Sequence, residues 1–200
     1  MIDKTHFFEL AKRDPQDVCR QAMCEYDANG EQYLLRVWDD EYRISPGRKT
    51  VDSAGIHGIP SFDYFGLFAV HYLLGAKPSN LSNEWMSEKD IPGGATFFRG
   101  PHAIPTALIS DRFGNDIDLF SKQCRKLFGT PLDMADVAYR FEITSRIPVA
   151  VLFWQGDDDF PPESSILYDK TIVDHLASDV VYALAVGICR RLSRPTGAST

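Results

Sequence analysis

An acidic stretch directly behind an apolar run is the part of this sequence best suited to chemistry. The run VLFW at residues 151–154 is followed, after Gln155, by GDDDFPPE at residues 156–163. Alternate side chains of an extended chain point to the same side, so the carboxylates of Asp157 and Asp159 can converge on one hard cation, with Glu163 returning across the proline corner. The pattern predicts a site for Mg²⁺ or a similar ion at Asp157, Asp159 and Glu163.

The same carboxylates have two other interpretations. Asp side chains commonly accept hydrogen bonds from the backbone N–H groups of their own turn, and consecutive prolines stiffen a corner. Paired carboxylates also serve as general acid and base in catalysis. Turn chemistry is the commonest of these uses, and the sequence alone leaves all three open.

A second group of candidate residues surrounds the Gly/Pro-rich middle of the chain. Arg99 and His102 lie in FFRGPH, and His57 lies between glycines in GIHGIP. An arginine fork beside glycine backbone suits a carboxylate or phosphate, so these three residues are expected to bind an anion. Trp85, in the polar stretch SNEWMSEKD, is expected to form the wall of a pocket. We predict Arg99, His102, His57 and Trp85 as ligand-binding residues.

Several familiar mechanisms lack their motifs in this chain. Neither G-x-G-x-x-G nor G-x-x-x-x-G-K-[ST] occurs, so both phosphate-binding loops are absent, and there is no G-x-S-x-G or H-E-x-x-H. The four cysteines have no C-x-x-C spacing, which favours reduced thiols over a disulfide framework and argues against a structural zinc or iron–sulfur site in this chain.

The elements that must position these residues can be read from the N-terminal half. Two short helices are expected first, the second capped by Asp14 with Pro15 in its first turn. The runs QYLLRVW and EYRIS, separated by two acidic residues, indicate a hairpin. Residues 61–75 are apolar all round the helical circumference, which predicts a central buried helix. A short helix is expected within SNEWMSEKD.

The C-terminal half reads as helix, three strands and helix. A helical region is expected over 105–128 with a break near Gly114. VAYRFEIT, VAVLFW and SSILYD are expected strands, and the apolar face of 179–192 predicts a final helix. Trp154, at the end of the second of these strands, is expected in the core.

Together these elements predict an α+β fold, in which helices and a central buried helix cover an antiparallel or mixed sheet. We expect one domain over residues 1–200, with residues 1–60 as a small N-terminal lobe of helices and hairpin. The formal net charge of −7 argues against a nucleic-acid partner. Because the chain shows no signal peptide and no membrane-spanning stretch, a soluble cytoplasmic protein without a membrane partner is expected.

Several stretches resemble a family of bacterial and archaeal domains of about 200 residues whose function is not assigned. They are EYD at 25–27, YRIS at 42–45, HYLLGAKP at 71–78, EWMSEKDIPGGATFF at 84–98 and VLFWQGDDDFPPESSILYD at 151–169. Some relatives carry this domain behind a cysteine-rich iron–sulfur module. The resemblance therefore implies a link to redox or corrinoid metabolism in anaerobes, with an iron–sulfur or corrinoid protein as partner. This chain lacks that module.

Three functions are consistent with these observations. The first is a non-enzymatic ligand-binding or accessory domain, favoured because no catalytic constellation is recognisable. The second is a metal-assisted enzyme that acts on an anionic small molecule, with the metal at Asp157, Asp159 and Glu163. The third is a structural subunit that buries an apolar patch in a homodimer.

Overall fold

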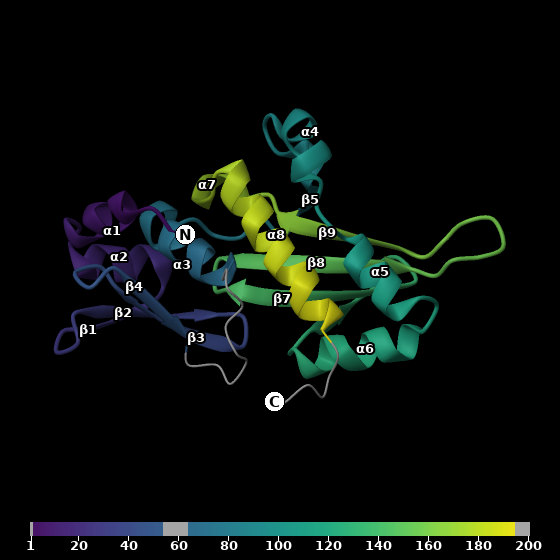
Figure 1. Cartoon of the computed structure of the whole chain (residues 1–200), viewed down its shortest axis with the longest axis horizontal. Coiled ribbons are helices and arrows are strands. Elements are labelled where there is room, and N and C mark those ends of the chain that lie inside the picture. Colours follow the sequence, from purple (N-terminus) through teal and green to yellow (C-terminus); the bar gives the residue numbers. More distant parts are fainter. Residues whose placement is uncertain (1, 54–63, 195–200) are drawn as a thin grey trace.

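The computed structural model describes residues 2–53 and 64–194 of the chain. It contains two antiparallel sheets, each with helices on one side (Figure 1). The α+β fold predicted from the sequence is therefore confirmed.

The N-terminal part consists of two short helices and a four-stranded meander. Helices α1 (Lys4–Ala11) and α2 (Pro15–Ala22) begin at Asp3 and Asp14, whose carboxylates accept hydrogen bonds from the first-turn N–H groups. The strands follow in chain order: β1 (Glu25–Asp27), β2 (Gln32–Val37), β3 (Asp40–Ser45) and β4 (Thr50–Ser53). The predicted hairpin is β2 and β3, paired from Tyr33 with Ile44 to Val37 with Asp40.

The second sheet belongs to the C-terminal part and has the order β5-β9-β8-β7-β6, with every neighbouring pair antiparallel. Its strands are β5 (Trp85–Ser87), β6 (Thr130–Leu132), β7 (Val137–Thr144), β8 (Ile147–Trp154) and β9 (Glu163–Asp169). The three strands predicted in this region are confirmed as β7, β8 and β9. Successive side chains along each strand point to opposite faces of the sheet, and in β8 those of Val149, Val151 and Phe153 point into the main core.

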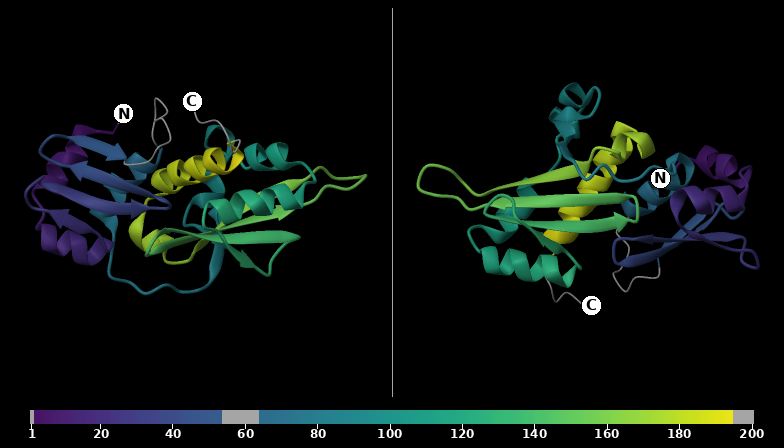
Figure 2. Two further views of the ribbon diagram at one scale, coloured as in Figure 1. Left: turned by 90° about the horizontal axis from the view of Figure 1, so that it is seen from below. Right: turned by 180° about the vertical axis from the view of Figure 1, so that it is seen from behind.

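Helices cover the core face of this sheet. They are α5 (Ala107–Phe113), α6 (Ile117–Lys126) and α8 (Ser178–Ser193), and the short helices α4 (Gly94–Phe97) and α7 (Ile172–His175) lie at its margin. Helix α3 (Tyr64–Gly75) packs instead against α8 and the strands of the N-terminal meander. Helix α8 crosses the sheet, and α3 connects it to the N-terminal meander (Figures 1 and 2). The central buried helix, the helical break near Gly114 and the final helix agree with the sequence prediction.

The short helix expected around SNEWMSEKD is limited to its last residues, and the expectation that Trp85 lies in it is wrong. Trp85–Ser87 forms the edge strand β5, and only Glu88–Asp90 makes one short 3₁₀ turn. The backbone of β5 pairs with β9, from Trp85 opposite Asp169 to Ser87 opposite Leu167. Pairing with an existing strand edge outweighs the weak local preference of a polar segment for helix.

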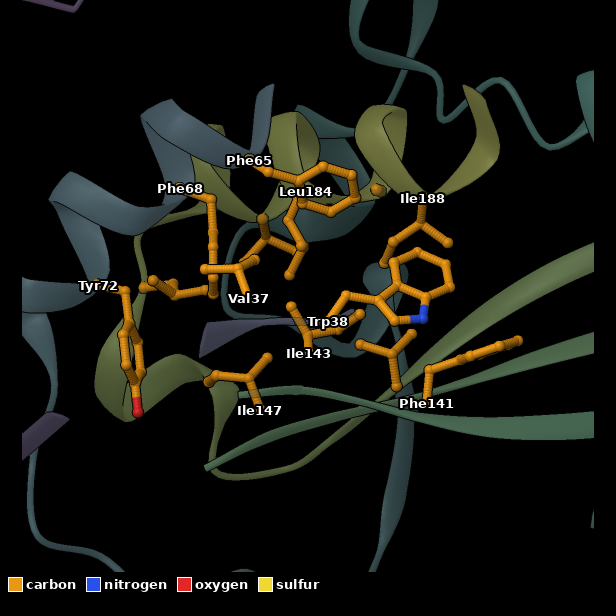
Figure 3. Close-up of a cluster of buried hydrophobic side chains, with 14 of the residues drawn as sticks. Val37, Trp38, Phe65, Phe68, Tyr72, Phe141, Ile143, Ile147, Leu184 and Ile188 are labelled. Carbon is orange, nitrogen blue, oxygen red and sulfur yellow. The ribbon is translucent and has the colours of Figure 1, made fainter. Parts of the chain in front are cut away.

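The turn of the β2–β3 hairpin joins the two sheets. Trp38 has a positive φ of 59°, and its side chain is buried, with 5% of its surface exposed. Its indole lies 4.8 Å from the ring of Phe141 and 5.9 Å from that of Phe65, between centroids, and its indole N–H donates to Leu127 O at 2.8 Å (Figure 3). Beside it, Asp39 forms an ion pair with Arg191 of α8 at 2.6 Å. A bulky side chain adopts this disfavoured conformation because its packing holds the sheets together.

Candidate functional site

The acidic stretch forms the loop of the β8–β9 hairpin, which projects from the sheet (Figure 1). Asp157 Oδ1 accepts hydrogen bonds from the N–H groups of Asp159 at 2.9 Å and Phe160 at 2.8 Å. These backbone hydrogen bonds hold the pKa of Asp157 below its usual range. Asp157 thus has the role of a turn acceptor, the first of the interpretations open from the sequence.

The other two predicted metal ligands are exposed at different places of the same hairpin. Asp159 lies in the loop, and Glu163 begins β9 opposite Trp154. Over residues 2–53 and 64–194, no three or more His, Cys, Asp or Glu side chains are grouped so that they could hold a metal ion. The structure therefore does not bring Asp157, Asp159 and Glu163 together as a ligand set, and a cation at this hairpin remains a prediction.

The predicted ligand-binding residues that the structure describes lie on two sides of the sheet. Arg99 and His102 belong to one exposed turn, and the His102 ring stacks on Phe97 at 4.6 Å and meets Tyr182 of α8 at 5.4 Å. Trp85 lies on the opposite face, away from α8, because it pairs with Asp169 in β9. Residue His57 lies outside the described residues. The structure does not place Trp85 in one cleft with Arg99 and His102.

A buried serine–histidine contact was not anticipated from the sequence. His175 Nε2 lies 3.2 Å from Ser79 Oγ, and His175 Nδ1 accepts the backbone N–H of Lys77 at 3.1 Å. Burial lowers the pKa of His175, which favours the neutral ring. Because Nδ1 accepts the Lys77 N–H, the proton of the neutral ring lies on Nε2 and is donated to Ser79. In this tautomer His175 cannot accept a proton from Ser79, so the pair positions the loop and does not form a nucleophile.

A buried carboxylate fixes the edge of the sheet. Asp169, only 3% exposed, accepts the N–H and hydroxyl of Ser82 (3.1 and 2.8 Å), the N–H of Asn83 (2.7 Å) and the N–H and hydroxyl of Thr171 (3.0 and 2.7 Å). Burial raises the pKa of Asp169, but the hydrogen bonds from Thr171 and Ser82 outweigh it and lower the pKa to about 2. This carboxylate orders the segment that leads into β5 and so positions Trp85 on the sheet.

The most distinctive surface of the molecule is the second face of the C-terminal sheet, which we term the open face. Its buried centre is formed by Ala138, Ala150 and Leu152, which form a hydrophobic cluster separate from the main core. Four half-buried apolar side chains pack around that centre: Trp85, Leu132, Met134 and Leu167. Within the part of the chain that the structure describes, no helix lies over β7, β8 and β9 on this side (Figure 2, right).

Strand β8 shows why this face is unusual. Every residue from Ile147 to Phe153 is buried, which is the pattern of a strand covered on both sides. An antiparallel sheet with one solvated face instead alternates apolar and polar residues. Trp154, predicted in the core, is 36% exposed. The open-face residues of β8, Ala150 and Leu152, are buried and pack against Trp85, Leu132, Met134 and Leu167.

One arginine interrupts the open face. Arg140 lies opposite Ala150 in the β7–β8 ladder and forms an ion pair with Glu142 at 2.8 Å, with its side chain 30% exposed. Its Nε is buried and has no hydrogen-bond partner among the described residues. Arg140 therefore adds a polar donor to the apolar surroundings of the open face.

Comparison with known proteins identifies the family. The model of a domain of unknown function, DUF3786, matches residues 14–191. The chain belongs to this family. No curated protein and no solved structure matches it. None of the described helices is long and apolar enough to cross a bilayer.

Of the predicted ligand-binding residues that the structure describes, only Trp85 lies on the open face. The other apolar residues of the open face were not predicted, because a continuous apolar run such as VAVLFW does not show whether one or both faces of its strand are covered. The sequence signal was present at β8, where apolar residues occupy consecutive positions 149–153, but its meaning depends on which elements cover the sheet.

Proposed function

We propose that the chain is a non-enzymatic accessory domain that docks a protein partner through the open face. The observation that carries this proposal is the ring of half-buried apolar side chains around Ala138, Ala150 and Leu152, namely Trp85, Leu132, Met134 and Leu167, on a sheet face without a covering helix in the described residues. Apolar surfaces of this kind commonly mark protein interfaces. The partner would present an apolar face with an acceptor for Arg140.

The chemistry of the other candidate sites supports a non-enzymatic role. The Ser79–His175 contact has the wrong proton arrangement for nucleophilic catalysis, and Asp157 is engaged by its own turn. The resemblance that implies redox or corrinoid metabolism makes an iron–sulfur protein or a corrinoid protein the first partner to test.

A homodimer is the second candidate, favoured by one observation. Arg140 and Glu142 lie on the same strand and face, so a two-fold axis through this surface can pair each Arg140 with Glu142 of the partner copy. Two sheets packed face to face would then bury both apolar centres, as in a β-sandwich.

The test uses one disruptive variant and one matched control. Leu167→Lys places a charge on the open face at a half-buried position. Val173→Lys places the same charge on α7, at an exposed apolar position. Light scattering measures self-association, and calorimetric titration with purified iron–sulfur and corrinoid proteins measures docking. We expect association with a second copy or a partner to be lost in Leu167→Lys and kept in Val173→Lys. A monomer that binds neither protein would contradict the proposal.

A further inference from the structure

Two of the four cysteines lie in contact at the end of helix α2. Cys19 occupies its last turn and Cys24 lies directly before β1, and their sulfur atoms are 3.7 Å apart. Both side chains are half-buried, whereas Cys124 and Cys189 are fully buried. All four thiols are free in the structure. The contact is therefore a pair of thiols that solutes can reach more easily than the other two.

The backbone of the helix end creates this contact. Met23 adopts the left-handed conformation, with φ of 54° and ψ of 52°, and the N–H groups of Met23 and Cys24 both point to Cys19 O. In this type of helix ending, the side chain four positions before the left-handed residue contacts the side chain directly after that residue, usually as a hydrophobic pair. Here that pair consists of two thiols, so the fold itself holds them together.

We propose that Cys19 and Cys24 form an oxidisable dithiol, which closes to an intramolecular disulfide in the presence of a hydroperoxide. One thiolate attacks the peroxide oxygen; the O–O bond breaks, and a sulfenic acid and water form when the oxidant is hydrogen peroxide. The second thiol then attacks the sulfenic sulfur, the S–S bond forms and a second water leaves. The two sulfurs are oxidised by two electrons in total, which the peroxide accepts, and a reducing dithiol reverses the reaction by exchange.

The environment sets the speed of this reaction. Burial raises the pKa of both Cys19 and Cys24, so the nucleophilic thiolate is scarce at neutral pH. Oxidation should therefore accelerate as the pH rises. The preformed contact favours closure once the first sulfur has reacted, because the resolving thiol is already adjacent.

The disulfide would act at a point where three parts of the fold meet. Ala22 O accepts the hydroxyl of Tyr72 from α3 at 3.1 Å, and Gln21 O accepts Arg146 Nε from the β7–β8 turn at 2.7 Å. A covalent link across the same helix end would restrain its opening. The oxidised protein should therefore show slower amide exchange over residues 21–24 and a higher Tm than the reduced protein.

The experiment begins with the reduced full chain treated with hydrogen peroxide. Free thiols are counted in denaturant and the linked peptides are identified by mass spectrometry. We expect the count to fall from four to two, with the link between Cys19 and Cys24, and dithiothreitol to restore four. In a Cys124→Ser control the count should fall from three to one.

Two further variants separate the proposed pair from general thiol oxidation. In Cys24→Ser and Cys19→Ser, no internal disulfide should form, and the remaining thiol of the pair should accumulate as a sulfenic acid that dimedone traps. The rise in Tm on oxidation should be absent in both. Four thiols retained after peroxide treatment, a link through Cys124 or Cys189, or a link between chains would overturn the proposal.

Discussion

The carboxylate of Asp169 makes a quantitative prediction, because one substitution changes its charge with little change in its shape. In Asp169→Asn, the amide oxygen can replace Oδ1 and keep the hydrogen bonds from Ser82 and Thr171. The amide NH₂ then replaces Oδ2, which accepts the N–H of Asn83 at 2.7 Å. One backbone donor therefore loses its acceptor and faces another donor.

The pKa of Asp169 gives the size of the effect. A pKa of about 2 in the folded state against 3.8 for the ordinary side chain corresponds to about 2 kcal/mol of stability at pH 7. Because the folded-state pKa is lowered, this stabilisation is present above the unfolded pKa and is lost as the pH falls through the folded one. By the same relation it is about 1 kcal/mol at pH 3 and well under 1 kcal/mol at pH 2.

We therefore expect Asp169→Asn to lose about 2–3 kcal/mol of unfolding free energy at pH 7, and about 1 kcal/mol less than that at pH 3. Urea unfolding followed by tryptophan fluorescence at both pH values measures the difference. The same substitution at the exposed Asp158 is the control and should change little at either pH. An Asp169→Asn effect of equal size at pH 7 and pH 3 would refute the reasoning.

Three more predictions concern the remaining structural features. Trp38→Ala should cost about 3–5 kcal/mol in urea unfolding, because it removes the buried indole between the sheets; an effect under about 1 kcal/mol would contradict that role. Burial lowers the pKa of His175 below its ordinary value of 6.5, so the unfolded state binds more protons than the folded state as the pH falls through 6.5. The Tm should therefore fall from pH 7.5 to pH 5.5, and it should fall less in His175→Gln. Asp157→Ala should accelerate amide exchange at Asp159 and Phe160, and a Mg²⁺ titration heat lost in this variant would instead support the cation interpretation.

Strong local patterns were sufficient for much of the fold. The apolar periodicity of 179–192 and the cap at Asp14 are local, and the structure has helices at these places. Strand β5 was mistaken because its strand conformation comes from pairing with β9, more than 70 residues later in the chain. Local propensity contains no information about that partner edge.

The Trp38 turn was hidden for a related reason. Hairpin turns with a positive φ favour Gly, Asn or Asp, so the sequence places the turn at the acidic residues after Trp38. The structure places Trp38 itself in the turn, because Phe65, Phe141 and Leu127 surround its indole. The candidate site was harder still: Trp85 was identified, but only the sheet order shows that it shares a face with Leu152 and Leu167.

The acidic hairpin loop bears on the docking that we propose for the open face. The β8–β9 hairpin projects beyond its neighbours and exposes Phe160 to 70%, so an uncharged loop would favour contacts between hairpin tips (Figure 1). Asp157, Asp158 and Asp159 place three carboxylates at that tip, where like charges oppose such contacts. On the open face, by contrast, the charged side chains Arg140 and Glu142 pair with each other. Charge at the tip therefore disfavours tip-to-tip contacts, which would compete with the docking that we propose for the open face. This gives three consecutive aspartates after a buried strand a role in preventing association at the tip, while a cation at Asp157 and Asp159 stays a prediction.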